Sequence, residues 1–176
     1  MSSFEINYYA GIGSRETPDD VLKLMTKIAE YLRSESYILR SGGADGADSA
    51  FEVGAGDNKE IFLPWKNFNS SKNSFIEIPR RAFEIAAEFH PVWSKLKDSV
   101  KCLHARNVMQ ILGRDFSTLS SFVICWTKGG KLVGGTSQAL RIAMKYEVPI
   151  FNLAIKEDRE RLENAVKLYR GGNDGI

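Results

Sequence analysis

The sequence has few of the residues that build metal sites and disulfide frameworks. Among its 176 residues are two cysteines and two histidines, and these are not spaced as metal ligands. We therefore expect no metal site. Cys102 and Cys125 fall in a predicted helix and a predicted strand, so nothing indicates a disulfide framework. A reducing, cytoplasmic location is the simpler inference.

Long hydrophobic runs and an excess of one charge are also missing. No apolar run is long enough to cross a bilayer, and the N-terminal residues lack the layout of a secretion signal, so we expect no membrane partner. Lysine and arginine number 24 against 22 acidic residues, which leaves a net charge of +2. A dedicated duplex-binding domain carries a much larger basic excess, so only a local groove would bind nucleic acid.

The residues that are present are typical of a globular protein, with 43% hydrophobic and 26% charged. The length suits a single domain over residues 1–176. Strand-like apolar runs at 6–10, 37–41, 60–63, 118–126 and 148–153 alternate with amphipathic helical segments. This alternation predicts an α/β fold, a Rossmann-like three-layer sandwich with a mostly parallel sheet of about five strands.

Glycine-rich turns follow three of the predicted strands, at 11–15, 41–48 and 134–136. Adjacent glycines let a backbone approach a ligand, and a helix N-terminus offers free N–H groups and a partial positive charge. Because the carboxyl ends of parallel strands meet at one edge, we expect these turns to converge on one nucleotide-sized ligand. The alternative is a set of tight turns without a ligand.

Two common nucleotide-binding motifs are not matched. The turn from Gly11 to Glu16 has two of the three glycines of the dinucleotide fingerprint, and the second strand ends in Arg40-Ser41 without an acid to hold a ribose. No glycine is followed by Lys-Ser or Lys-Thr as in a P-loop. The sequence therefore predicts neither a nicotinamide-dependent dehydrogenase nor a P-loop enzyme, and no cofactor.

The motifs Gly-Ile-Gly-Ser-Arg at 11–15, Ser-Gly-Gly-Ala-Asp-Gly-Ala-Asp at 41–48, Arg106-Asn107 and Gly135-Thr136 occur in the order seen in the SLOG superfamily. The chain resembles that superfamily from Ala10 to about Leu153. Its members include the Rossmann-like domain of the DNA-processing protein A (Smf) family and the "lonely guy" nucleoside-monophosphate phosphoribohydrolases. The resemblance implies a domain that binds nucleotides, nucleotide derivatives or nucleic acid, and that self-associates as a homo-oligomer.

The sequence departs from both of these relatives. The catalytic glutamate that follows the Gly-Thr motif of the phosphoribohydrolases is replaced by Ala139, with Gln138 beside it. This replacement argues against that activity. In the DNA-processing family the Rossmann-like domain is usually accompanied by other domains, whereas here we expect nothing after a last helix at 158–169 and a loose tail at 171–175.

The residues predicted to bind the ligand come from the turns, the strand ends and a helix at 100–112. They are Gly11, Gly13, Ser14, Arg15, Ser41, Gly42, Gly43, Ala44, Gly46, Trp65, Arg106, Asn107, Gly134, Gly135 and Thr136. Arg15 would clamp a phosphate, or else pair with a neighbouring acid at the surface. Trp65 would stack on a base or pack in the core. Arg106 and Asn107 are included because of the resemblance.

Asp48 and Asp45 are the candidate catalytic residues. Asp48 would bind a ribose hydroxyl or act as general base in N-glycosidic cleavage, or it would only complement the helix dipole. Asp45 is the weaker candidate and would otherwise cap the helix. Structural roles are expected for His90 and His104.

Two further expectations concern local structure. Thr17 is predicted to cap a helix that begins with Pro18. The polar segment 66–74 is too long for a routine connection and predicts a mobile flap or lid.

Three functions follow from these observations. The leading hypothesis is binding of a nucleotide or nucleotide-derived small molecule, by a sensor, a sequestering protein or an N-glycosidic hydrolase or transferase. The alternative is a module for single-stranded nucleic acid that uses Arg15, Lys66 and Arg106. The third is a protein-interaction scaffold whose site has decayed.

Overall fold

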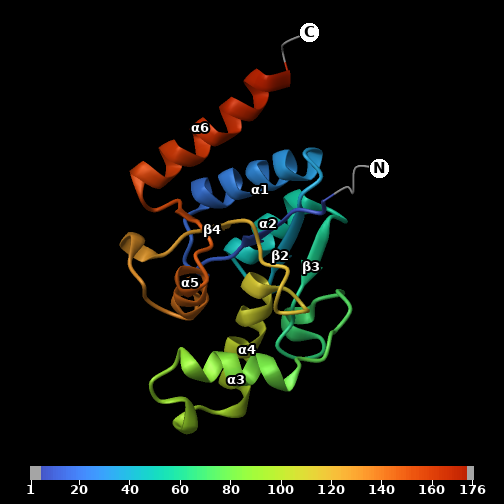
Figure 1. The fold of residues 1–176 in the computed structure, drawn as a ribbon, viewed down its shortest axis with the longest axis vertical. Helices are drawn as coiled ribbons and strands as arrows, with labels where there is room; N and C mark the ends of the chain where they lie inside the picture. The colour runs from blue at the N-terminus through green and yellow to red at the C-terminus, as the bar shows by residue number, and fades with distance from the viewer. Residues whose placement is uncertain (1–4, 174–176) are drawn as a thin grey trace.

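The computed structural model describes the backbone of residues 5–173 and the side chains of residues 5–165. Within that range the chain forms a five-stranded parallel sheet in the order β3-β2-β1-β4-β5, with helices on both faces (Figure 1). The strands are β1 (Tyr8–Gly11), β2 (Ile38–Ser41), β3 (Lys59–Ile61), β4 (Val123–Cys125) and β5 (Ile150–Asn152). The helices are α1 (Asp19–Ser34), α2 (Ala47–Ala55), α3 (Arg80–Glu88), α4 (Asp98–Leu112), α5 (Thr136–Lys145) and α6 (Lys156–Asn173). The predicted α/β three-layer fold is confirmed.

The sheet separates two hydrophobic cores. One core contains residues of α3, α4 and α5, and the other contains residues of α1 and α2 with Leu162 of α6. The period of two along each strand assigns its side chains to these cores: Ala10 joins the first and Tyr9 the second. The same alternation places Val123 and Cys125 in the first core and Ile124 in the second. Strands covered on both faces are apolar throughout, as β4 is.

The topology determines where a ligand site can form. The helix after β1 covers the second core, whereas the helix after β4 covers the first, and β1 and β4 are neighbours in the sheet. The connections from these two strands therefore diverge at their carboxyl ends. Such a switch point opens a crevice in open α/β sheets.

The turn after β1 is held by Thr17, but not in the predicted way. The N-cap of α1 is Pro18, and this end of the helix has no side-chain cap. The Thr17 hydroxyl instead donates to the Ser14 carbonyl at 2.6 Å. The prediction of a Thr17 cap was wrong, because the helix begins one residue later than expected and Thr17 belongs to the preceding turn.

Two predicted boundaries also differ from the structure. The strand expected at 118–126 is restricted to β4, because the segment before it bonds to α4: the Ser120 hydroxyl donates to the Gln110 carbonyl at 2.7 Å. The last helix is longer than predicted, so the first three residues of the expected tail 171–175 are helical. Residues 174 and 175 lie outside the described range.

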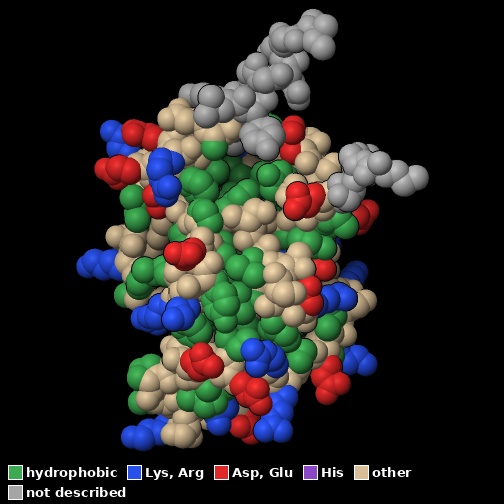
Figure 2. Space-filling view, in the orientation of Figure 1, with side chains coloured by type: hydrophobic (Ala, Val, Ile, Leu, Met, Phe, Trp, Pro, Cys, Tyr) green, Lys and Arg blue, Asp and Glu red, His purple; other side chains and the backbone are tan. Residues whose placement is uncertain are grey.

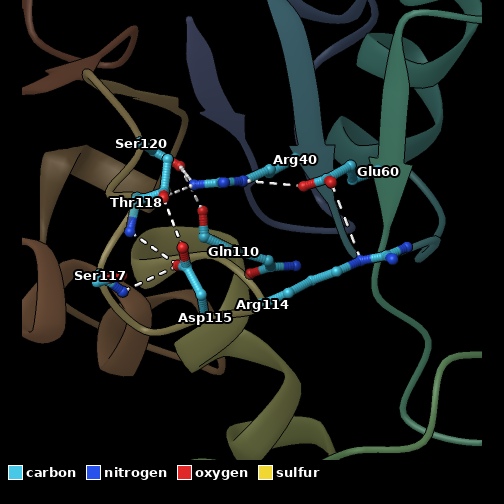
Figure 3. Close-up of polar contacts among 8 residues, drawn as sticks. All are labelled: Arg40, Glu60, Gln110, Arg114, Asp115, Ser117, Thr118 and Ser120. Atoms are coloured by element: carbon cyan, nitrogen blue, oxygen red, sulfur yellow. Dashed lines mark hydrogen bonds and ion pairs between the residues drawn. The ribbon is translucent and has the colours of Figure 1, made fainter. Parts of the chain in front are cut away.

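A buried arginine ties the strands to that segment. The guanidinium of Arg40 in β2 pairs with Glu60 of β3 at 3.1 Å and donates to the Thr118 carbonyl at 2.6 Å and the Ser120 hydroxyl at 3.3 Å (Figure 3). It also lies over the Tyr8 ring, 3.8 Å from its centroid. Every one of these partners comes from the chain itself, so Arg40 is a structural connection.

None of the helices that the structure describes combines the length and the apolar character needed to cross a bilayer. Acidic and basic side chains are interspersed over the face drawn in Figure 2. This mixture agrees with the small net charge of +2.

Candidate functional site

A pocket of about 610 Å³ lies at the carboxyl edge of the sheet, where the turns after β1, β2 and β4 meet α4. Its buried lining residues, which we call the floor, include Asp48, Arg106, Asn107, Gln110 and Gln138. Its exposed lining residues, which we call the rim, include Arg15, Glu16, Gly134, Gly135 and Arg141. The turns predicted to converge therefore do share one cavity.

The turn after β2 is rigidly packed. The Ser41 hydroxyl donates to the Gly11 carbonyl at 2.6 Å, which ties the ends of β2 and β1 together. A Cβ at Gly42 would lie 2.1 Å from Nη1 of Arg106, so only glycine leaves room for that guanidinium. Gly46 has a φ of +81° and lies against the backbone of Arg15, which joins this turn to the turn after β1.

Asp48 and Arg106 place opposite charges at the floor of the pocket. Arg106 donates through Nη1 to the carbonyls of Gly42 and Phe62 and through Nε to Asn107 Oδ1. The Asp48 carboxylate accepts from the Ala44 amide at 3.2 Å. Within the described residues, no ion pair of 4.0 Å or less joins the two side chains directly.

Burial dominates the titration of both groups. It raises the pKa of Asp48 to about 6, although the Arg106 charge and the backbone amides of Ala44 and Gly42 act in the opposite direction. Burial lowers the pKa of Arg106, and the Asp48 charge opposes that change. A carboxyl group that titrates close to neutral pH is suited to proton transfer. The catalytic role of Asp48 stays a prediction.

The turn after β4 differs from the turn after β2. No described heavy atom lies within 4 Å of a Cβ built on Gly134 or Gly135, and both residues are exposed. Gly134 has a φ of +74°, which favours glycine, but Gly135 has a φ of −64° that any residue adopts. The turn is connected to the floor by Asn107, whose Nδ2 donates to the Gly135 carbonyl at 3.3 Å.

Arginines outnumber acids around the pocket. Arg15, Arg106 and Arg141 line it together with Glu16 and Asp48. The N-terminal ends of α2 and α5 also face this cavity, through Ala44 and Asp48 at one and Gly135 to Ser137 at the other. Helix N-termini add partial positive charge, so the pocket is locally suited to an anion although the molecule as a whole is nearly neutral.

Known structures were compared with this chain. No protein-family model matches it, and no curated protein sequence does. One solved structure, DNA processing protein A from Helicobacter pylori, matches with a TM-score of 0.56 and 22% identity, over 91% of this chain and 73% of that one. That protein has a single-stranded DNA binding mode.

DNA processing protein A from Streptococcus pneumoniae matches with a TM-score of 0.51 and 16% identity, over 92% of this chain and 57% of that one. The fold is similar to that of DNA processing protein A. At these identities the likeness concerns the fold alone. The chain spans about three quarters of the first protein and just over half of the second.

The structure brings most of the predicted site residues to the pocket. Those that line it are Gly13, Ser14, Arg15, Ala44, Asp48, Arg106, Asn107, Gly134, Gly135 and Thr136. Their roles toward a ligand stay predictions.

The other predicted residues lie behind or beside the pocket. Gly11, Ser41, Gly42 and Gly46 are among the packing contacts that hold the turns, and Gly43 lines a second, smaller cavity. Asp45 is exposed and accepts from Asn69 Nδ2 at 2.8 Å. Trp65 packs edge-on against Phe68, with ring centroids 5.1 Å apart, outside the lining of the main pocket.

The segment 66–74 does not cover the pocket as a lid would. Phe68 is buried in the second core, and Asn69 donates to the Gly43 carbonyl at 3.2 Å. Asn73 donates to Glu52 of α2 at 2.7 Å. The segment therefore braces the outer side of the turn after β2, and its length is explained by that packing.

Several lining residues were not predicted as site residues, among them Gln110, Gln138 and Arg141, and both histidines were expected to be structural only. A signal for Gln110 was present. It follows Arg106 and Asn107 at helical spacing on a segment that otherwise reads Val-Met and Ile-Leu, so these polar residues share one side of a buried helix. Among the described residues, no three His, Cys, Asp or Glu side chains gather as metal ligands.

Proposed function

We propose that the protein binds single-stranded nucleic acid, with one nucleotide unit seated in the pocket at the carboxyl edge of the sheet. The observation that carries the proposal is the combination of a floor of buried polar side chains with a rim that presents Arg15 and Arg141 beside two helix N-termini. The proposal is also supported by the fold that this chain shares with DNA processing protein A from Helicobacter pylori, which has a single-stranded DNA binding mode.

The size and charge of the pocket favour binding of one nucleotide unit over binding of a long stretch of the strand in a continuous groove. About 610 Å³ is at the lower to middle part of the range for small-molecule sites and accommodates a nucleotide-sized group. Exposed arginines at the rim leave room for flanking phosphates to continue along the surface. Since bulk charge supplies little attraction, we expect modest affinity that depends on these few cations.

A free nucleotide or nucleotide derivative is the competing ligand for the same pocket, and N-glycosidic cleavage by Asp48 is its enzymatic form. The raised pKa of Asp48, about 6, is the observation that favours it. Incubation with nucleoside monophosphates, followed by chromatography for free base, tests this version. Release of base that is lost in Asp48→Asn would favour the enzyme over the binding module.

Replacement of Arg15 by alanine tests the proposed function. A 20-nucleotide labelled oligothymidylate is titrated with wild-type protein, Arg15→Ala and Arg81→Ala at several salt concentrations, and binding is read by fluorescence anisotropy. Arg81 is an exposed arginine of α3 outside the pocket lining, so it is a matched control. We expect Arg15→Ala to weaken binding and to reduce the slope of log affinity against log salt by about 0.7, the value for one phosphate contact.

Arg81→Ala should retain the wild-type affinity and slope. Equal losses in both variants would mean that the attraction is not localised at the pocket. A wild-type affinity that does not depend on salt, or no binding at moderate salt, would remove the proposed function.

Membership of the SLOG superfamily and self-association are parts of the same proposal that come from the resemblance in sequence, whereas the cytoplasmic location comes from the cysteines. Light scattering coupled to size exclusion measures the oligomeric state directly. A monomer at all accessible concentrations would remove that part and leave the binding proposal in place.

A further inference from the structure

Gln110 is a buried polar side chain whose carboxamide has no partner among the described residues. The residue is 2% exposed, yet the carboxamide has no hydrogen bond to any described residue. Its backbone carbonyl is used, because it accepts from the Ser120 hydroxyl at 2.7 Å. In Figure 3 the side chain extends away from that contact.

The carboxamide is not sealed inside the protein. The buried side-chain atoms that lack both a partner and solvent contact in the described range are the Tyr9 hydroxyl and His104 Nδ1, and the Gln110 amide is not among them. Gln110 also lines the pocket. Its donor and acceptor therefore face the cavity, within a residue that is otherwise enclosed.

No bond within the described chain requires a polar side chain at Gln110. The residue lies between Met109 and Ile111, which are fully buried and apolar. An apolar side chain of similar length would therefore break no hydrogen bond of the fold at this position. A Cβ on Gly42 would lie 2.4 Å from Gln110 Nε2, so the glycine at the end of β2 keeps the space that the amide occupies.

The other carboxamides of the floor differ because they are already paired. Asn107 Nδ2 donates to Gln138 Oε1 at 3.2 Å, and Asn107 Oδ1 accepts from Arg106. Gln138 Nε2 donates to the Ala86 carbonyl at 3.4 Å. Of these three carboxamides, only that of Gln110 lacks a partner among the described residues.

We infer that the Gln110 carboxamide hydrogen-bonds to the edge of a nucleobase inserted into the pocket, which makes it a specificity-determining residue. The inference rests on the proposed function and names the part of the nucleotide that enters. A carboxamide pairs bidentately with an adjacent donor and acceptor, as on a base edge. The base, rather than the phosphate, faces the floor, because there the Asp48 and Arg106 charges offset each other, whereas the exposed arginines at the rim remain for phosphates.

The test compares Gln110→Met with Gln138→Met, two substitutions of a buried glutamine by an apolar residue of similar length. Binding to labelled 20-nucleotide oligomers of dA, dC and dT, and to an abasic tetrahydrofuran 20-mer with the same phosphates, is measured by anisotropy. Thermal unfolding of each protein without ligand is measured in parallel. The abasic oligomer keeps the phosphate contribution and removes the base.

Wild-type protein should bind at least one base-bearing oligomer about tenfold more tightly than the abasic one, as expected for a bidentate contact. Gln110→Met should lose most of that preference, keep the abasic affinity, and melt at the wild-type temperature or above it. Gln138→Met should melt at a lower temperature, because it breaks bonds within the chain.

Three results would overturn the inference. Gln110→Met that keeps the full preference for a base would show that the amide contacts no base. Gln110→Met that melts as low as Gln138→Met would assign the amide a structural role. If wild-type protein binds neither type of oligomer, the proposed function is wrong and the inference falls with it.

Discussion

Arg40 and Arg106 are both almost fully buried, at 2% and 7% exposed, but their surroundings differ. The guanidinium of Arg40 is matched by a carboxylate in direct contact, by further acceptors and by an aromatic ring (Figure 3). Arg106 bonds to carbonyls and to Asn107, while the Asp48 carboxylate acts on it without a direct ion pair in the described range. Arg40 thus has a carboxylate in direct contact, whereas Arg106, which lies 5.6 Å from the centroid of the Phe68 ring, borders a cavity.

The difference separates a structural charge from a charge available to a ligand. A buried ion costs several kcal/mol unless it is paired, so an arginine that is fully matched inside the chain is explained by the fold. Arg106 is held in position by acceptors on one side and lines the pocket on the other. Substitution of Arg40 should therefore reduce the stability of the fold more than substitutions beside Arg106.

The largest expected effect is at Arg40. Arg40→Ala should lower the free energy of unfolding by about 3 kcal/mol, near the lower end for a broken buried pair, because Glu60 keeps some solvent contact. Urea titration measures it, with Arg114→Ala as the control. Arg114 lies 3.9 Å from the same carboxylate but is 57% exposed, so its loss should cost less than about 1 kcal/mol. Equal effects would contradict the structural role of Arg40.

A smaller effect is expected beside Arg106. Gly42→Ala should destabilise the protein by about 2 kcal/mol, because the added methyl group meets the Arg106 guanidinium and the Gln110 amide. Gly135→Ala should change stability by less than about 0.5 kcal/mol, because nothing lies within 4 Å of its Cβ and its φ is ordinary. Urea titration of both variants checks the contrast between the packed and the open turn. If Gly42→Ala is neutral, the turn after β2 is not rigid.

A pH-dependent effect is expected at Asp48. Its pKa in the folded protein is raised to about 6 from 3.8, so it favours the folded state below pH 4, and that contribution is lost as the pH rises through 6. In Asp48→Asn the contribution should be absent. The difference in unfolding free energy between Asp48→Asn and wild type should therefore shift in favour of the variant between pH 4 and pH 7. A difference that is constant with pH would show that the pKa of Asp48 is not raised.

Local patterns explain why much of the fold could be predicted. Continuous apolar runs such as Val123 to Cys125, followed by turns and amphipathic helices, depend on neighbours in sequence. The same holds for the glycine turns, where positive φ at Gly43, Gly46 and Gly134 is a local requirement. Eight of the ten predicted site residues that line the pocket come from these turns, and the other two, Arg106 and Asn107, come from α4.

Contacts that the sequence pattern does not show explain the errors. The segment 66–74 was expected to be a lid, but its Asn69 bonds to a turn 26 residues earlier. Thr17 was expected to cap a helix, but the fold of the turn offers it the Ser14 carbonyl. In each case the competing partner depends on how the chain packs.

By itself, the sequence determined the order of strands and helices, the parallel sheet and the convergence of its glycine turns, because these follow from periodicity and from the geometry of a parallel sheet. Only the tertiary structure decided that Arg40 pairs directly with Glu60, that Asp48 and Arg106 share a floor, and that Gln110 faces the pocket without a partner among the described residues. The physical reason is that burial and hydrogen-bond partners are set by atoms from distant segments. Identical side-chain chemistry therefore supports the fold at Arg40 and faces a cavity at Arg106.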